Sequence, residues 1–307
     1  MANATIGLRA PFPWFGGKSR VSDVVWEAFG DVANYVEPFA GSLAVLLARP
    51  HEPKIETVND ADCYLANFWR AVTLAPDDVA SWADWPVNEA DLHARHVWLL
   101  QQDVFRERMK SDPEFCDTKI AGWWVWGLCS WIGSGWCDVK SGTHRKLPHL
   151  GDAGRGVHRP SQQLPHLGNA GMGVREYMQA LSRRLRRVRV ACGDWTRVLG
   201  DSVTWRHGQT GVFLDPPYSD GEIDYSSGGR GISADVARWA RENGGNPKLR
   251  IAICGYDGEH EMPGWRVVAW KTRGGYASQG DGTNENGKRE RIWLSPHCHG
   301  PKQRTLF

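Results

Sequence analysis

The sequence predicts an α/β fold: a Rossmann-like sheet with helices on both faces, plus an inserted region that is mainly helical and loop. Short apolar runs alternate with helical patterns up to about residue 75 and again from residue 188, which is typical of parallel sheets with crossover helices. Residues 76–175 instead show helix-capping signals, helical periodicity and then a Gly-, His- and Arg-rich stretch. We therefore predict one sheet domain, formed by residues 1–75 and 176–307, with residues 76–175 inserted into it.

Two strand–turn–helix units are expected near the N-terminus. In ANYVEPFAGSLAVLLA (33–48), a short strand precedes a glycine-containing turn and a helix that begins near Ser42. KIETVNDADCYLANFWRAV (54–72) repeats this order, with Asp60 between the strand and the helix. The further apolar runs that we expect to contain strands are VRVACGDW (188–195), TGVFLDPPY (210–218), KLRIAICGY (248–256), WRVVAW (265–270) and RERIWLS (289–295).

The DPPY segment marks the end of one of these strands. Val212–Leu214 reads as a short buried strand, and Asp215 follows it directly. Pro216 and Pro217 donate no backbone N–H and restrict φ, so they end the strand and stiffen the loop. Asp215 and Tyr218 are thus expected at the carboxyl end of a strand, where open α/β sheets bind ligands. The alternative is an ordinary turn in which Asp215 caps a helix.

Acidic residues follow four of the expected strands. They are Glu37, Asp60, Asp194 and Asp215. Gly41 precedes Asp60 by about the 20 residues that separate a dinucleotide-fold glycine turn from its ribose-binding acid. Neither G-x-G-x-x-G nor G-x-x-x-x-G-K-[ST] occurs, which favours a nucleoside cofactor without a pyrophosphate.

Positive charge is concentrated in one part of the chain. The formal net charge is +2, yet the segment from Lys140 to Val190 holds eleven Lys and Arg residues against two acidic ones. Such a block indicates a face that binds a polyanion. The alternative for SRRLRRVRV is a solvated arginine face above a buried stripe of Leu181, Leu185 and Val188.

The seven cysteines are scattered and form no C-x-x-C pair, which argues against a disulfide framework or a zinc site. PHCHG (296–300) lacks a second ligand pair, so we expect no metal. The sequence has neither an export signal nor an apolar window of about 18 residues. We expect a soluble, cytoplasmic protein.

Five segments together resemble a known family. APFPWFGGKSR, YVEPFAGSLAVLL, VNDADCYLANFWRAV, CGDW and FLDPPY, in this order, resemble the motifs of the Dam-type adenine-specific DNA methyltransferases over roughly residues 10–75 and 175–300. The resemblance implies S-adenosylmethionine as cofactor and site-specific methylation, at N6, of an adenine flipped out of double-stranded DNA. It also implies that residues 1–75 and 176–307 form the cofactor-binding catalytic domain, a methyltransferase sheet, and that residues 76–175 are the DNA target-recognition region.

The resemblance further implies cofactor contacts in four motifs and a catalytic loop in the fifth. Asp215 is expected to border the cofactor as well as the target amine. The residues are Trp14 and Lys18 against S-adenosylmethionine and its carboxylate, Glu37, Phe39 and Gly41 beneath its methionine part, Asp60 at its ribose, Asp194 and Trp195 beside its adenine, and Asp215, Pro216, Pro217 and Tyr218 in the catalytic loop.

The loop suits methylation of an exocyclic amine. Such an amine is a poor nucleophile because its lone pair is delocalised into the aromatic ring. The carboxylate of Asp215 and the carbonyl of Pro216 can each accept one N–H, which favours in-line attack on a sulfonium methyl through positioning and electrostatics. Tyr218 offers a ring for stacking on the extruded base.

Some features depart from the family pattern. Leu43 stands where many relatives have glycine, and the Trp-rich segment lacks the Asn and Arg that relatives carry near the DNA. The repeat LPHLGDAGRGV (147–157) and LPHLGNAGMGV (164–174) has no counterpart in that pattern. Two other functions stay open at this point: a cytosine-N4 DNA methyltransferase, and a catalytically inactive DNA-binding relative.

Two partner surfaces are predicted. In the basic segment we expect DNA contacts from Arg145, Lys146, Arg155 and Arg159. The tail PKQRTLF (301–307) resembles the Q-x-x-L-F peptide that binds the bacterial sliding clamp, through Gln303, Leu306 and Phe307. The alternative is that Leu306 and Phe307 fold back onto the protein's own surface.

Overall fold

A computed structural model of the protein describes residues 8–12, 14, 18–112, 114–131, 136–137, 173–218, 231–270 and 289–300. The chain divides into two compact units. The sheet unit comprises Gly16–Asn59 and Asp194–Phe307, and the helical unit comprises Met1–Phe15 and Asp60–Gly193. These units are defined by contacts and the predicted regions by role, so the predicted division stays a prediction.

Several predicted residues lie outside the described part of the chain. They are the DNA-contact residues Arg145, Lys146, Arg155 and Arg159, most of the LPHLG repeats, and the tail residues Gln303, Leu306 and Phe307.

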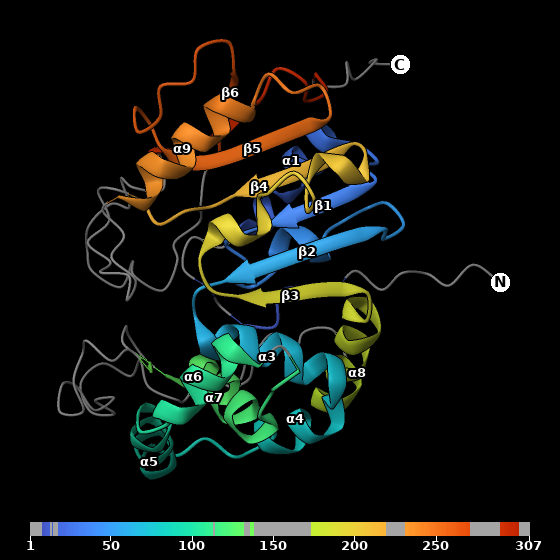
Figure 1. Cartoon of the computed structure of the whole chain (residues 1–307). Coiled ribbons are helices and arrows are strands. Elements are labelled where there is room, and N and C mark those ends of the chain that lie inside the picture. The colour runs from blue at the N-terminus through green and yellow to red at the C-terminus, as the bar shows by residue number, and fades with distance from the viewer. Residues whose placement is uncertain are drawn as a thin grey trace, which may run out of the picture. The chain divides into compact units, whose positions relative to one another are not determined.

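The sheet unit contains a mixed, mostly parallel sheet (Figure 1). Its first four strands in spatial order are parallel, whereas β7 runs antiparallel to both of its neighbours. This arrangement confirms the predicted α/β class. The strands, in spatial order, are β2 (Ile55–Asp60), β1 (Asn34–Glu37), β4 (Thr210–Leu214), β5 (Leu249–Tyr256), β7 (Glu290–Leu294) and β6 (Arg266–Ala269).

Helices cover both faces of the central strands. α1 (Ser22–Phe29) and α9 (Ile232–Asn243) both contact β5 and lie on opposite sides of the sheet (Figure 1). A strand covered on both faces is apolar throughout rather than alternating. This explains why all five residues of β4 are buried.

Strand register brings particular residues to one edge of the sheet. Val36 of β1 pairs with Val212 of β4, and Leu214 of β4 pairs with Ile253 of β5, all in parallel. The carboxyl ends of these three strands therefore share one edge. Because β7 is antiparallel to β5, with Glu290 opposite Tyr256, the first residue of β7 comes to that same edge.

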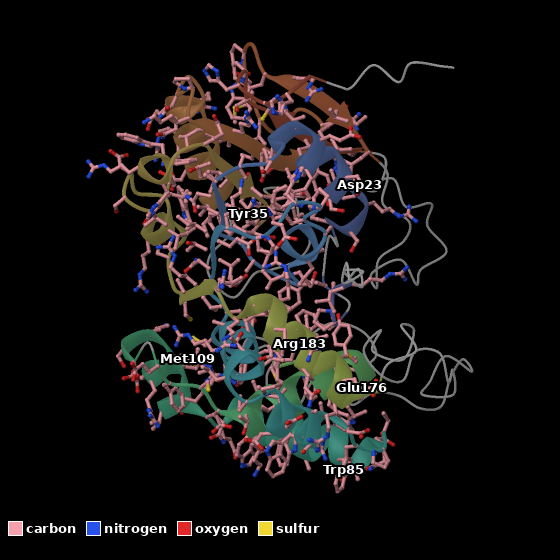
Figure 2. All side chains as sticks on the ribbon, turned by 90° about the vertical axis from the view of Figure 1, so that its right-hand side faces the viewer. Asp23, Tyr35, Trp85, Met109, Glu176 and Arg183 are labelled. Atoms are coloured by element: carbon pink, nitrogen blue, oxygen red, sulfur yellow. The ribbon has the colours of Figure 1, made fainter. Side chains whose placement is uncertain are left out.

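The helical unit has an aromatic core. Phe12 lies 5.4 Å from Trp124 and 5.7 Å from Trp69, measured between ring centroids, and all three side chains are buried. Figure 2 shows the side chains of both units, with Met109 labelled in the helical unit and Tyr35 in the sheet unit. The elements are α3 (Cys63–Leu74), α4 (Pro76–Ala83), α5 (Glu89–Leu100), α6 (Asp103–Ser111), α7 (Thr118–Ser130), α8 (Val174–Leu185) and β3 (Val188–Cys192).

The arginine-rich segment splits into a helix and a strand. Leu181 and Leu185 are buried in α8, as the stripe predicted, but Val188 begins β3 and is half-buried. Arg183 is exposed on α8 (Figure 2). In the described part of the chain, no helix is long and apolar enough to cross a membrane.

Candidate active site

A buried ion pair lies at the end of β4. Asp215 is the first residue after the strand, and its Oδ1 is 2.9 Å from Nζ of Lys18. Lys18 begins the 3₁₀ helix η1 (Lys18–Arg20), and its side chain is 7% exposed, against 20% for that of Asp215. Pro216, which cannot extend the strand, is buried beside Asp215. The ammonium group therefore faces a carboxylate that retains some access to solvent.

The hydroxyl of Tyr218 lies near two carboxylates. Its hydroxyl lies 3.3 Å from Oδ1 of Asp215 and 3.0 Å from Oε2 of Glu290. The Tyr218 ring packs edge-on against Tyr256 of β5, at 4.7 Å between centroids. Nζ of Lys18 lies 5.2 Å from the centre of the Tyr218 ring, within the range of a cation–π contact. The side chain is thus held at its hydroxyl and along its ring.

Burial and charge together set the ionisation of this cluster. Burial raises the pKa of Asp215 above its ordinary value, while the charge of Lys18 lowers it. Burial also raises the pKa of Glu290; Lys18 opposes this effect, and the charge of Asp215 adds to it. For Lys18, burial lowers the pKa, but the charges led by that of Asp215 outweigh burial and raise it above the ordinary range. Lys18 therefore stays protonated and favours the ionised form of Asp215.

The glycine turn follows β1. Glu37 is buried and accepts a hydrogen bond of 2.9 Å from the hydroxyl of Tyr35. Asn59 fixes the turn, since its side-chain amide donates to the carbonyl of Pro38 and its own carbonyl accepts from the N–H of Ala40. The predicted turn is therefore anchored on β1 and β2.

Two residues of this turn adopt a left-handed backbone conformation. Gly41 has φ of 45° and Leu43 has φ of 55°. Glycine tolerates this conformation, whereas a residue with a Cβ is strained by it. The position where the sequence departs from the family pattern is thus a position that favours glycine, and Leu43 occupies it while fully buried.

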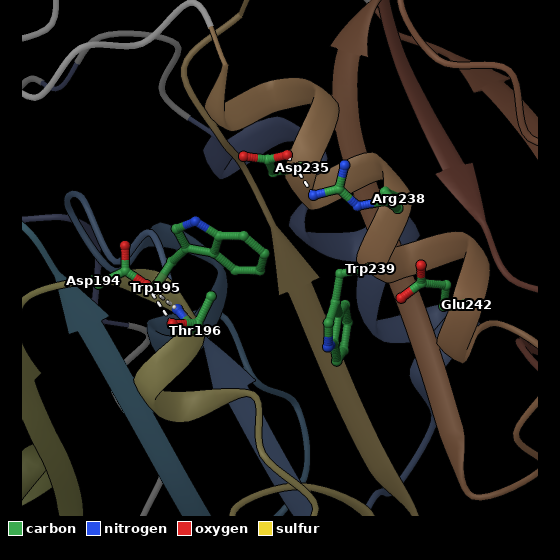
Figure 3. Close-up of a pocket in the computed structure, with 7 residues that line it drawn as sticks. All are labelled: Asp194, Trp195, Thr196, Asp235, Arg238, Trp239 and Glu242. Atoms are coloured by element: carbon green, nitrogen blue, oxygen red, sulfur yellow. Dashed lines mark hydrogen bonds and ion pairs between the residues drawn. The ribbon is translucent and has the colours of Figure 1, made fainter.

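Two aromatic rings from distant parts of the sequence stack beside the turn. The rings of Phe39 and Trp195 are inclined by only 27°, with centroids 6.3 Å apart. Trp195 also borders an open pocket of about 330 Å³, with Trp239 and acidic residues of α9 on the other side (Figure 3). Asp194 lines this pocket too, and its Oδ1 accepts the backbone N–H and the hydroxyl of Thr196. Asp194 therefore caps the 3₁₀ helix η5 (Trp195–Val198).

Trp14 and Asp60 belong to the helical unit. Trp14 is half-buried and packs against Phe12 and Trp124, at 5.8 and 6.3 Å between ring centroids. Asp60 ends β2, and its Oδ1 accepts the N–H of Asp62 at 2.9 Å. Their cofactor roles stay predictions, as do those of the predicted site residues in the sheet unit.

Within the sheet unit, two groups of predicted residues come together. Lys18, Asp215 and Tyr218 form one, and Phe39 and Trp195 form the other. Lys18 contacts the carboxylate of Asp215, a contact that the sequence did not predict. Glu290 was missed as well, because it begins its strand, whereas the acidic residues singled out in the sequence were expected to follow theirs. The signal that could have found it is the acidic residue near the start of RERIWLS.

Comparison with protein families identifies one match. Residues 14–110 match the family model described as D12 class N6 adenine-specific DNA methyltransferase. The matched segment includes Lys18, the glycine turn and Asp60, and it ends before the DPPY loop. A search of curated proteins gives no match at a significant level.

Proposed function

We propose that this chain transfers the methyl group of S-adenosylmethionine to N6 of an adenine in DNA, at the edge of the sheet unit. The proposal is supported by the match of residues 14–110 to the D12 class of N6 adenine-specific DNA methyltransferases. Adenine-N6 DNA methylation is the activity of that class. The observation that carries the assignment to this edge is the buried Lys18–Asp215 pair, with Tyr218 on the same carboxylate.

The DPPY loop provides the groups that handle the amine. The carboxylate of Asp215 and the carbonyl of Pro216 each accept a hydrogen bond from one N–H of the target amine. The nitrogen lone pair is thereby directed at the methyl carbon. Lys18 favours the ionised form of Asp215. This form is a better hydrogen-bond acceptor than the protonated carboxyl group. The ring of Tyr218 stacks on the extruded base, a contact worth about 1–3 kcal/mol in proteins that bind single strands.

The surroundings of Phe39 and Trp195 fit a nucleoside cofactor. Two nearly parallel rings and a pocket lined by aromatic and acidic side chains suit a flat base attached to a cationic group. Glu37 and Gly41 would lie beneath the methionine part, and Asp194 and Trp195 beside the base. When bound, S-adenosylmethionine supplies a methyl group on a positively charged sulfur. For Trp14, Lys18 and Asp60 we propose the cofactor contacts that the family resemblance implies.

Labelled methyl transfer to mixed-sequence DNA, followed by digestion and nucleoside analysis, tests this proposal. We expect N6-methyladenine. N4-methylcytosine would identify the cytosine enzyme, and DNA binding without any methylated nucleoside would identify an inactive relative.

In Asp215→Ala the transfer should vanish, while calorimetry still detects binding of S-adenosylhomocysteine. Full activity in this variant would contradict the mechanism.

The partner surfaces rest on the sequence. We propose that Arg145, Lys146, Arg155 and Arg159 contact the DNA phosphates, as in a target-recognition region. We also propose that Gln303, Leu306 and Phe307 bind the sliding clamp, which would raise the local concentration of the enzyme on newly copied DNA. A pull-down with purified clamp tests the second proposal. Full-length protein should bind and a chain ending at Lys302 should not; equal or absent binding would refute it.

A further inference from the structure

Glu290 lies at the proposed site without a role in it. It is 5% exposed and begins β7, opposite Tyr256 of β5. It reaches this edge only because β7 is antiparallel to β5, so that the amino end of one strand lies beside the carboxyl end of the other. A buried carboxylate is costly unless it is paired or hydrogen-bonded. Its Oε2 accepts a hydrogen bond from the hydroxyl of Tyr218.

The hydroxyl of Tyr218 has one hydrogen and two carboxylates within reach. Oδ1 of Asp215 already accepts from Lys18 at 2.9 Å, and it lies 3.3 Å from the hydroxyl. Oε2 of Glu290 is nearer, at 3.0 Å. The better acceptor for the single hydrogen is therefore Glu290, and the hydroxyl oxygen is left facing the carboxylate–ammonium pair.

This bond fixes the ring as well as the hydroxyl. The Tyr218 ring is bounded by Tyr256 at 4.7 Å, and Nζ of Lys18 lies 5.2 Å from its centre. These contacts act on the ring, whereas Glu290 acts on the phenolic oxygen at the far end of the side chain. Together they leave the tyrosine little freedom to rotate. A ring that is already ordered loses less entropy when it stacks on a base.

We propose that Glu290 is a positioning residue of the methyl-transfer site, which holds the hydroxyl of Tyr218 and so presents its ring to the target base. This inference rests on the proposed function, since it takes Tyr218 as the ring that stacks on the base. Glu290 itself contacts neither base nor cofactor in this role.

A double-mutant cycle tests the proposal. Glu290→Ala and Tyr218→Phe remove the same hydrogen bond, so each should lower kcat/KM for DNA by about tenfold, the size expected for a hydrogen bond to a charged group. The double variant should be no worse than either single one. Glu290→Gln retains an acceptor oxygen and should stay within about threefold of the wild type. Affinity for S-adenosylhomocysteine should be unchanged in all four variants, which also shows that they fold.

Additive losses, or a Glu290→Gln variant as impaired as Glu290→Ala, would overturn the inference. Absence of methyl transfer in the wild type would instead overturn the proposed function. In that case the same cycle, measured on the free energy of unfolding, still decides whether Glu290 and Tyr218 are coupled. Independent effects on stability would then reject the positioning role.

Discussion

At the scale of single residues, Leu43 combines two opposing effects. Its φ of 55° costs about 1–2 kcal/mol for a residue with a Cβ, while its side chain is fully buried. Leu43→Ala and Leu43→Gly should both be less stable than the wild type, because loss of a buried leucine costs about 2–5 kcal/mol. Leu43→Gly should nevertheless be the more stable of the two by about 1 kcal/mol, since glycine removes the strain.

Urea unfolding measures this difference in stability. The matched control is Ala44→Gly, at the first residue of α2 (Ala44–Leu47), where glycine should destabilise by about 0.5–1 kcal/mol relative to alanine. Glycine should thus give a more stable protein than alanine at the position of Leu43, whereas alanine should be the more stable choice at Ala44. A Leu43→Ala protein at least as stable as Leu43→Gly would show that the turn carries no strain at this position.

We expect Lys18 to influence the pH at which the proposed site can work. Asp215 accepts both N–H and ammonium groups best as a carboxylate, and the charge of Lys18 lowers its pKa against the effect of burial. Lys18→Met removes that charge, so the pKa of Asp215 should rise. Activity should then be lost at a higher pH on acidification than in the wild type.

The measurement is kcat against pH with saturating cofactor and DNA. Lys18→Arg keeps the positive charge and should leave the acidic limb of the profile close to that of the wild type. An acidic limb in Lys18→Met that is unmoved, or displaced to lower pH, would show that the Lys18–Asp215 pair does not control ionisation during turnover.

At the scale of elements, the sequence predicts what local pattern determines. The uninterrupted apolar run of Val212–Leu214 identified β4, because a strand covered on both faces needs no alternation. The prolines located its end, and thereby Asp215. RERIWLS was recognised as a strand, but its direction depends on pairing with a distant segment. That direction decides whether Glu290 reaches the site, so local pattern could not identify this residue.

Close packing between α1 and β4 gives an element-scale prediction. A Cβ added to Gly211 of β4 would lie 2.7 Å from Cδ2 of Phe29, which is closer than two non-bonded carbon atoms approach. Gly211→Ala should therefore destabilise the protein by about 1–3 kcal/mol through overpacking. Gly200→Ala is the control, since a Cβ there meets nothing within 4 Å. Urea unfolding of both variants tests the prediction, and equal stabilities would show that α1 can move away from β4.

At the scale of the whole molecule, charge distribution is more informative than net charge. The chain carries a formal charge of only +2, yet eleven Lys and Arg residues and two acidic ones lie between Lys140 and Val190. The rest of the chain is therefore net acidic, and a polyanion such as DNA should be attracted to this segment rather than to the protein as a whole. Part of the segment is α8 and β3, whose exposed arginines offer an alternative surface.

Salt dependence distinguishes these two surfaces. Each phosphate contact contributes about 0.9 to the slope of log Kobs against log salt, so neutralising Arg145, Lys146, Arg155 and Arg159 together to glutamine should lower the magnitude of the slope by up to about 3–4. The matched control neutralises Arg183, Arg186, Arg187 and Arg189, which are exposed in the structure. This control changes the net charge by the same amount.

If only the first set flattens the slope, the DNA lies on the inserted region. If only the control set does so, α8 and β3 carry the DNA and the LPHLG repeats need another explanation. Equal flattening by both sets would mean that the overall charge, rather than a defined surface, governs binding.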